Sequence, residues 1–305
     1  MPSPTFSRQR LLQAWLRILA RLLLAKYHPV VIGVTGSVGK SSTKEAIALA
    51  LSDQVRVRKS EGNYNNEIGI PLTILGTKSA GRSIWGWIRV SFRFLTTYLA
   101  GRSRYPEVLV LELGIDAPGD MDYLVSFLPI QVGVVTHISE SHVEHFGSLA
   151  AIAKEKGKLI ESLPPSGTAI LSADDARVSE MQSRTQARVI TYGFGEQADV
   201  RGDHLAFHPE RNGGYTLKIS YQGKSLPLRL PHIIARHHIP AVLAALAVAV
   251  SLKVNLVEVA NTLAAFRPLP GRLNLLSGKY GTQLLDDTYN ASRPRLRLPW
   301  RCSAR

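Results

Sequence analysis

The sequence of 305 residues contains a single cysteine, Cys302, which lies close to its end. A lone thiol cannot form an internal disulfide framework or a cysteine-based metal site. The chain is therefore expected to fold around hydrophobic cores in a reducing, cytoplasmic setting. With 45% apolar residues, it is long enough for one large domain and a smaller unit.

Long hydrophobic runs are also missing. The leucine-rich stretch from Leu11 to Leu24 is interrupted by Arg17 and Arg21 and lacks a small-residue cleavage site. This argues against a signal peptide, and a membrane-spanning helix needs roughly 18 uninterrupted apolar residues. The sequence predicts a soluble protein that contacts a membrane only at a surface.

Acidic side chains are absent from three segments that hold most of the positive charge. Residues 1–29 contain five basic side chains, residues 68–106 contain six and residues 293–305 contain five. The net charge is +14, so the rest of the chain is close to neutral. An evenly basic surface is therefore not indicated, and no nucleic-acid partner is expected.

Apolar segments typical of strands alternate with helical segments along most of the chain. Residues 30–34 have the β-branched density of a buried parallel strand, and helical character resumes from Lys44 to Leu51. This alternation predicts an α/β fold with a doubly wound, mostly parallel sheet and a small antiparallel section. Further strands are expected at 108–113, 132–136 and 168–171, antiparallel segments at 187–192 and 215–221, and helix over 240–265.

Residues 7–27 predict an amphipathic helix that Pro29 ends. One interpretation is an interfacial membrane anchor, because a cationic face opposite Trp and Leu binds anionic lipid. The other is a helix packed on the core domain, and both interpretations apply equally to 85–99, where Arg89 and Arg93 are four residues apart. The polar face of 7–27 comprises Arg10, Gln13, Arg17 and Arg21, and its apolar face Trp15, Ile18, Leu19 and Leu22.

The most specific motif joins the first strand to its helix. It runs from Gly33 through Gly36 and Gly39 to Lys40 and Ser41, with five residues between the outer glycines. Glycines let main-chain N–H groups converge on phosphate oxygens, the Lys40 ammonium reaches the β- and γ-phosphates, and the Ser41 hydroxyl binds Mg²⁺. The motif predicts ATP binding, against the alternative of a plain glycine-rich turn. The candidate nucleotide-binding residues here are Thr35, Gly36, Ser37, Gly39, Lys40, Ser41 and Ser42.

The loop, extended to Thr43, resembles the ATP loop of the Mur ligase family more than that of kinases or GTPases. Further segments resemble family motifs in the expected order, so that the resemblance covers residues 30–291. They are S-E-G-N-Y-N-N-E-I-G-I-P at 60–71, Glu112 after a core strand, T-H-I-S-E-S-H-V-E-H-F-G at 136–147, the lysine segment 153–160, P-G-R at 270–272 and D-D-T-Y-N-A at 286–291.

The resemblance implies a P-loop Mur ligase central domain that phosphorylates a carboxylate with ATP and joins the resulting acyl phosphate to an amine. Its implied cofactors are ATP and Mg²⁺. The implied catalytic residues are Lys40, His142 and Lys156; the implied metal ligands are Ser41, Glu112, His142 and Lys156 as a carbamate. Rival positions are Lys154 and Lys158 for the carbamate, and His137 and His145 for the histidine. The implied substrate contacts are Asn63, Asn65 and Asn66, and further nucleotide contacts are His237, Arg272, Asp287 and Asn290.

Within the family, the motifs at residues 62–69 and 286–291 resemble those of the branch that adds D-alanyl-D-alanine to UDP-muramoyl-tripeptide. This implies these two substrates, and the protein is expected to be a monomer. A folylpolyglutamate or cyanophycin-type ligase is the alternative with the same chemistry. The alternative from another class is an ATP-binding or membrane-surface module without catalysis.

The sequence departs from the family pattern in three places. Only about 29 residues precede the first strand, where the family carries a UDP-sugar domain, and His238 and Ala241 stand where it usually shows asparagines. Residues 292–305 are Arg-rich without periodicity, which is typical of a frameshifted or cut gene end, with a basic tail for an acidic partner as the alternative. The expected units are a helix over 1–29, an ATP-binding domain over 30–268 and the start of a truncated C-terminal domain from 269.

Overall fold

The computed structural model describes residues 4–140, 143–209, 214–279 and 282–289. Within this part of the chain, nine strands form one sheet. They are β1 Val30–Thr35, β2 Val57–Lys59, β3 Val108–Glu112, β4 Ile130–Val135, β5 Thr168–Ser172, β6 Arg188–Gly193, β7 Val200–Phe207, β8 Tyr215–Tyr221 and β9 Lys224–Leu230. Their spatial order is β2-β3-β1-β4-β5-β6-β7-β8-β9. The strand pairs from β2 to β7 are parallel, and β7, β8 and β9 pair antiparallel.

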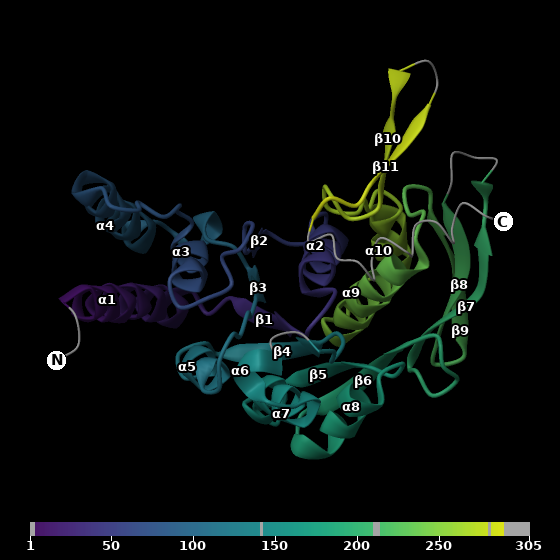
Figure 1. Ribbon diagram of the computed structural model, residues 1–305, viewed down its shortest axis with the longest axis horizontal. Coiled ribbons are helices and arrows are strands. Elements are labelled where there is room, and N and C mark those ends of the chain that lie inside the picture. Colours follow the sequence, from purple (N-terminus) through teal and green to yellow (C-terminus); the bar gives the residue numbers. More distant parts are fainter. Residues whose placement is uncertain (1–3, 141–142, 210–213, 280–281, 290–305) are drawn as a thin grey trace.

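Helices cover both faces of this sheet (Figure 1). One core lies between the sheet and α2, α9 and α10, and the other between the sheet and α1, α3, α5 and α7. The helices are α1 Pro4–Tyr27, α2 Lys40–Leu51, α3 Gly69–Leu75, α4 Ile84–Leu99, α5 Asp120–Val125, α6 Val143–Phe146, α7 Leu149–Glu161, α8 Ala176–Ser179, α9 Ile239–Ser251 and α10 Leu256–Leu263. The predicted doubly wound α/β fold is confirmed.

The central strands form because their residues are apolar on both sides of the chain. Every residue of β3 is buried, and so are all residues of β1 after Val30, as expected for parallel strands covered on both faces. Because β3, β1 and β4 are parallel neighbours, their carboxyl ends meet at one edge of the sheet. In sheets of this kind ligands bind at that edge.

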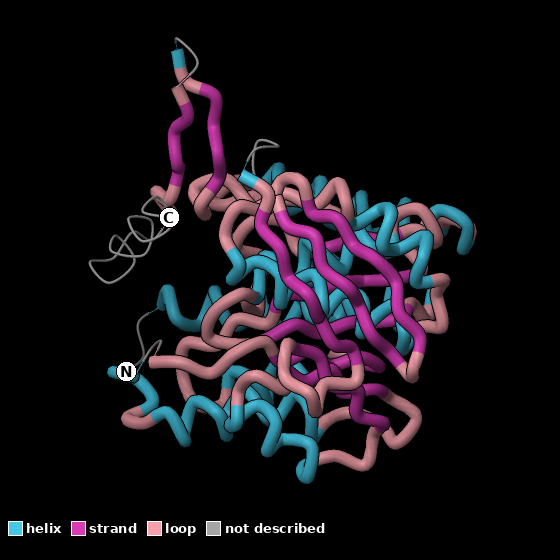
Figure 2. Tube along the Cα trace, turned by 90° about the vertical axis from the view of Figure 1, so that its right-hand side faces the viewer, coloured by secondary structure: helices cyan, strands magenta, loops and turns pink. Residues whose placement is uncertain are grey.

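One strand differs from its prediction. The segment 187–192 was expected to be antiparallel, whereas β6 pairs parallel with β5 over its first five residues, from Arg188 to Tyr192. The antiparallel section begins only at β7 and extends the main sheet, as Figure 2 shows for three long neighbouring strands. Short alternating strands carry no signal of direction, so the sequence could not distinguish the two cases.

The first helix packs against α3 and α4, and its buried residues share a core with those of the sheet, which confirms the core-packing interpretation of residues 7–27. The predicted apolar face is wrong in part, because Ile18 and Leu22 are exposed. The buried stripe is instead Leu16, Leu19, Ala20, Leu23, Leu24 and Tyr27. Both stripes have helical spacing, and only the position of the neighbouring helix decides between them.

A hairpin of β10 Asn274–Ser277 and β11 Gln283–Asp286 forms a second, two-stranded sheet. It projects from the body of the molecule (Figure 2). The predicted division at residues 29 and 269 stays a prediction. None of the helices in the described part of the chain has the length and apolar character needed to cross a membrane.

Candidate functional site

The turn from β1 into α2 packs against the end of β4. Gly36 has φ +147° and Gly39 has φ +86°, values that favour glycine. A Cβ on Gly36 would lie 1.9 Å from Oγ1 of Thr136, so only a hydrogen fits there. Gly33 lies inside β1 and not in the turn, so the phosphate-type loop is Gly36 to Gly39. This corrects the sequence-based reading, in which Gly33 and Gly39 bounded the loop.

Lys40 is the first residue of α2 and folds back over this loop. Its Nζ donates a hydrogen bond to the carbonyl oxygen of Gly36 at 2.8 Å. Burial lowers the pKa of the Lys40 ammonium, and the Glu112 carboxylate opposes that shift. A partly desolvated ammonium beside a helix N-terminus forms a strong site for an anion.

Ser41 and Glu112 come together as predicted. Ser41 Oγ donates to Oε1 of Glu112 at 3.2 Å, and the Glu112 side chain is held at the end of β3 with 3% exposure. Its Oε2 has no hydrogen-bond donor, and Nζ of Lys44 lies 3.4 Å away in ion-pair contact only. A carboxylate oxygen with open coordination next to a hydroxyl fits Mg²⁺, which prefers such hard oxygen ligands.

The three candidate lysines of α7 have different surroundings. Lys156 is 2% exposed, and burial, followed by the charge of Lys40, lowers its pKa to about 7. Lys154 is exposed, and Lys158 is 2.6 Å from both Asp122 and Glu155. The Lys156 amine is therefore about half neutral near pH 7, and it is close enough to Lys40 to feel its charge.

A cavity of about 550 Å³ opens beside the loop. It lies between α2, the ends of β4 and β5, the start of α9 and the segment before β10. Arg272 also reaches toward the loop, with Nη2 3.5 Å from Ser41 Oγ. Five predicted residues share the cavity wall, namely Gly39, Ser42, His237, Arg272 and Asp287.

The sequence named His137 only as a rival histidine and did not single out its partner Asp175, which follows Asp174 of the cavity wall. Nδ1 of His137 lies 2.7 Å from Oδ2 of Asp175, and the main chain of His137 accepts a bond from Ser37 N at 2.6 Å. Asp175 also caps α8 through the N–H groups of Arg177 and Val178. Their positions in the sequence could have indicated them, because both residues follow neighbouring parallel strands, where ligands bind in sheets of this kind.

The asparagine segment has mainly a structural role in this conformation. Oδ1 of Asn66 accepts the N–H groups of Ile68 and Gly69, which begins α3. The carbonyl of Asn65 accepts Gly114 N at 2.8 Å, and this ties the segment to the end of β3 beside Glu112. Asn63 is exposed. The turn interpretation therefore accounts for Asn66, while Asn65 lies next to the candidate metal site.

Two predicted residues, His142 and Asn290, lie outside the described residues. Of the rival histidines, His137 lines the cavity and His145 is exposed on α6. Within the described ranges, no three His, Cys, Asp or Glu side chains cluster as a metal site by themselves. A metal at Ser41 and Glu112 would therefore need oxygen ligands from a bound phosphate or from a modified lysine.

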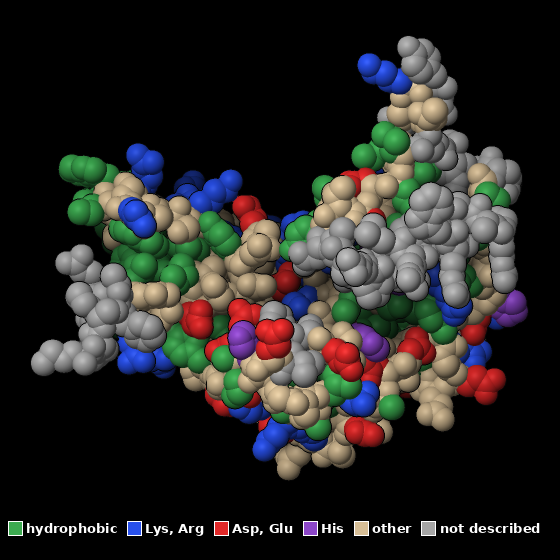
Figure 3. All heavy atoms as spheres, in the orientation of Figure 1, with side chains coloured by type: hydrophobic (Ala, Val, Ile, Leu, Met, Phe, Trp, Pro, Cys, Tyr) green, Lys and Arg blue, Asp and Glu red, His purple; other side chains and the backbone are tan. Residues whose placement is uncertain are grey.

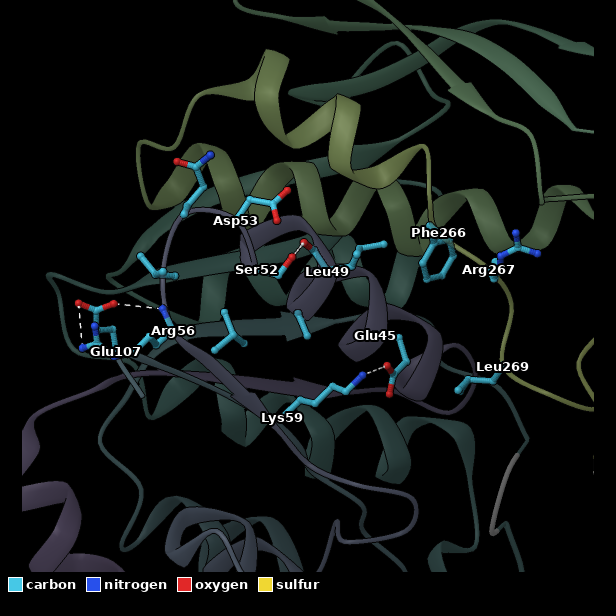
Figure 4. Close-up of a pocket in the computed structure, with 14 residues that line it drawn as sticks. Glu45, Leu49, Ser52, Asp53, Arg56, Lys59, Glu107, Phe266, Arg267 and Leu269 are labelled. Carbon is cyan, nitrogen blue, oxygen red and sulfur yellow. Dashed lines mark hydrogen bonds and ion pairs between the residues drawn. The ribbon is translucent and has the colours of Figure 1, made fainter. Parts of the chain in front are cut away.

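A larger cavity of about 820 Å³ lies on the other side of α2, between β2 and the segment 266–269 (Figure 4). Four of its charged side chains form two ion pairs: Lys59 contacts Glu45, and Arg56 lies 3.3 Å from Glu107. Figure 4 shows both pairs turned toward each other along the wall. This cavity has no loop of main-chain N–H groups and no net charge bias, so it is not a candidate phosphate site.

Comparison with known proteins agrees with this geometry. The sequence pattern of the Mur ligase middle domain matches residues 34–85 and 94–249. The UDP-N-acetylmuramoyl-tripeptide–D-alanyl-D-alanine ligase of Escherichia coli is 32% identical over 265 residues, which are 86% of this chain and 52% of that protein. The Bacillus subtilis ligase of the same name is 30% identical over 91% of this chain and 53% of its own length.

Among solved structures, the MurF ligase of Thermotoga maritima in complex with ADP superimposes with a TM-score of 0.77 at 26% identity. The match covers 95% of this chain and 60% of that one. The chain thus spans about half the length of the curated relatives it matches. Because the middle-domain pattern covers well over half of the chain and the fold agrees, the chain belongs to the Mur ligase family.

Proposed function

We propose that this chain is the ATP-binding part of a carboxylate–amine ligase of peptidoglycan-precursor synthesis. The observation that supports it most directly is the placement of Lys156. A nucleotide-binding loop alone needs Lys40 and the helix N-terminus. It does not need a second lysine that is buried, has its pKa lowered to about 7 and lies within electrostatic reach of the first.

ATP is the proposed nucleotide. The loop from Gly36 to Gly39 supplies main-chain donors for its phosphates, and the Lys40 ammonium, now on the Gly36 carbonyl, would turn to the phosphate oxygens. The cavity of about 550 Å³ beside the loop is large enough for the base and ribose. His237, Arg272 and Asp287 on its wall are the proposed contacts there. That the relative from Thermotoga maritima was solved in complex with ADP supports an adenine nucleotide as the ligand.

Mg²⁺ is the proposed metal, held by the Ser41 hydroxyl, the open oxygen of Glu112 and a carbamate on Lys156. When bound, it would neutralise phosphate charge that otherwise repels an approaching carboxylate. Carbamylation needs a neutral amine, which the lowered pKa of Lys156 provides near pH 7.

The proposed reaction transfers the γ-phosphoryl group of ATP to a substrate carboxylate, which gives an acyl phosphate and ADP. An amine then attacks the acyl carbon, forms the amide bond, releases phosphate and loses a proton to solvent. The chain's own contribution is positioning and charge: Lys40 stabilises the transferring phosphoryl group, and the loop amides orient it. Arg272, with Nη2 3.5 Å from Ser41 Oγ, brings a second cationic side chain to the same place.

The proposed substrates are UDP-muramoyl-tripeptide and D-alanyl-D-alanine, because the relatives from Escherichia coli and Bacillus subtilis bear the name of that ligase. This favours the D-alanyl-D-alanine branch over a folylpolyglutamate-type ligase. We further propose a cytoplasmic monomer. Asn63 and Asn65 are the proposed substrate contacts, with Asn66 shaping the loop around them.

Phosphate release tests this proposal. The chain, with ATP and Mg²⁺, is expected to release phosphate when both UDP-muramoyl-tripeptide and D-alanyl-D-alanine are added, and to release little when either is omitted. Lys40→Ala is the control for contaminating phosphatase. Normal ATP binding without phosphate release in the complete mixture would overturn the ligase proposal and favour an ATP-binding module without catalysis.

A further inference from the structure

Helix α4 presents one of its faces to the fold and the opposite face to solvent. On the inner side, Val90 is buried, and the Trp87 ring meets that of Trp15 of α1 edge to face with centroids 6.0 Å apart. At the end of the helix, Tyr27 Oη donates to the carbonyl oxygen of Ala100 at 2.8 Å. These contacts hold α4 firmly against α1, so its outer face is not needed for folding.

The outer face of α4 is apolar. Trp85 is 78% exposed and Phe92 is 65% exposed, although both are large hydrophobic side chains. The exposed residues recur every three or four positions and therefore form one stripe along the helix. This stripe, which we call the α4 face, consists of Ile84, Trp85, Ile88, Phe92, Leu95 and Leu99.

Basic side chains surround the α4 face. Arg89 and Arg93 follow one flank of the stripe, and residues 68–106 contain no acidic side chain. Within the described ranges, no ion pair occupies these arginines. Figure 3 shows hydrophobic side chains gathered at the upper left, over α4, with Lys and Arg side chains beside them. The exposed basic residues of this region are Lys78, Arg82, Arg89, Arg93, Arg102 and Arg104.

We propose that the α4 face docks on an anionic lipid bilayer surface. An apolar stripe with an exposed Trp, flanked by cations and lying parallel to the protein surface, fits the boundary between lipid headgroups and acyl chains. The complementary charge belongs to the lipid, because the region carries six cations and no acid. A nucleic acid would satisfy the arginines but leave the apolar stripe in water.

The α4 face is separate from the candidate ligase site. No residue of α1 or α4 lines the cavity beside the phosphate-type loop. Residues 86–93, at the centre of the helix, also lie outside both stretches that match the Mur ligase middle domain. The surface is therefore not explained by nucleotide binding, and the proposal does not rest on the ligase proposal.

Vesicle co-sedimentation of the whole chain tests the proposal. We expect binding to vesicles of phosphatidylglycerol and phosphatidylcholine, weakening as salt is added, and little binding to phosphatidylcholine alone. Arg89→Gln with Arg93→Gln should weaken binding about 25-fold, since each cation near an anionic surface contributes roughly fivefold. Trp85→Ser with Phe92→Ser should weaken binding at least about tenfold, because apolar burial is lost.

Matched variants elsewhere serve as controls. Val257→Ser removes an apolar side chain of similar exposure (59%) from α10, and Lys218→Gln with Arg229→Gln removes two exposed cations from β8 and β9. These should leave vesicle binding unchanged. Absent binding to anionic vesicles, equal binding to neutral ones, or equal losses in the control variants would each overturn the proposal. Phosphate release, which should be unaffected in all of these variants, reports separately on the ligase site.

Discussion

Nζ of Lys44 lies 3.4 Å from Oε2 of Glu112, and both side chains are almost completely buried. The pair joins α2 to the end of β3, directly below the phosphate-type loop. Glu45 extends it on the other side, 3.6 Å from the same ammonium and in contact with Lys59. A buried cation therefore balances the carboxylate that is proposed to bind Mg²⁺.

Lys44→Met should destabilise the chain by about 3–5 kcal/mol, because it leaves the Glu112 charge buried without its partner. Urea unfolding followed by circular dichroism measures the loss. Adding Glu112→Gln should recover part of it, since no unpaired charge then remains. A double variant no more stable than Lys44→Met alone would contradict the coupling between the two residues.

Lys40→Ala should weaken ATP binding by about 10- to 100-fold, the range expected for one hydrogen bond from a charged donor. Fluorescence titration with a labelled nucleotide measures it. The unfolding midpoint should change little, because the hydrogen bonds of Lys40 Nζ go to two carbonyl oxygens of the loop itself, those of Gly36 and Ser37. Lys154→Ala, at an exposed position of α7, is the matched control and should bind ATP normally. Unchanged ATP affinity in Lys40→Ala would contradict every nucleotide contact assigned above.

Much of the site could be predicted because its residues follow parallel strands. Three parts of the site had recognisable sequence motifs: the loop after β1, Glu112 at the end of β3 and the segment after β4. Because these strands are parallel, the three parts meet at one edge of the sheet. The resemblance already implied Lys156, and the structure adds the physical reason: burial distinguishes it from Lys154, and ion pairs distinguish it from Lys158.

Other features had no sequence signal. The burial of Lys44 was not predicted, because its ion-pair partner Glu112 lies 68 positions away in the chain. The apolar stripe of α1 was misplaced by one helical position because two stripes have the same spacing. Tertiary packing decides which distant charges pair and which of two equivalent helix faces is buried. The periodicity of apolar residues in the sequence does not predict either of them.

His238 should make stability depend on pH between about 4 and 6.5. Burial lowers its pKa from 6.5 to about 4, and its Nε2 lies 3.0 Å from the carbonyl oxygen of Arg272. Between these two values the unfolded chain binds a proton that the folded chain does not, so stability falls as pH falls, by up to about 3 kcal/mol. His238→Asn, a neutral side chain, should remove this part of the pH dependence in urea unfolding. The exposed His145→Asn should not, and parallel curves for the two variants would contradict the assignment.

Lys156 should show a pH dependence of the same sign, in a higher pH range. Its pKa is lowered from 10.5 to about 7, so between these values only the unfolded chain holds the proton and stability rises with pH. Without bicarbonate and magnesium, the slope should reach about 1.4 kcal/mol per pH unit and should vanish in Lys156→Met, but not in Lys154→Met.

The same neutral amine should react with carbon dioxide. With isotopically labelled bicarbonate, carbon NMR should detect one carbamate signal that grows as pH rises through about 7 and is absent from Lys156→Met. Lys154→Met keeps the signal, because that side chain is exposed and its removal leaves the buried amine in place. A carbamate signal that persists in Lys156→Met would contradict the proposed metal ligand, and so would the absence of any carbamate signal from the unmodified chain at pH 8. The roles of Lys40 and Glu112 are tested separately, by nucleotide and magnesium titration.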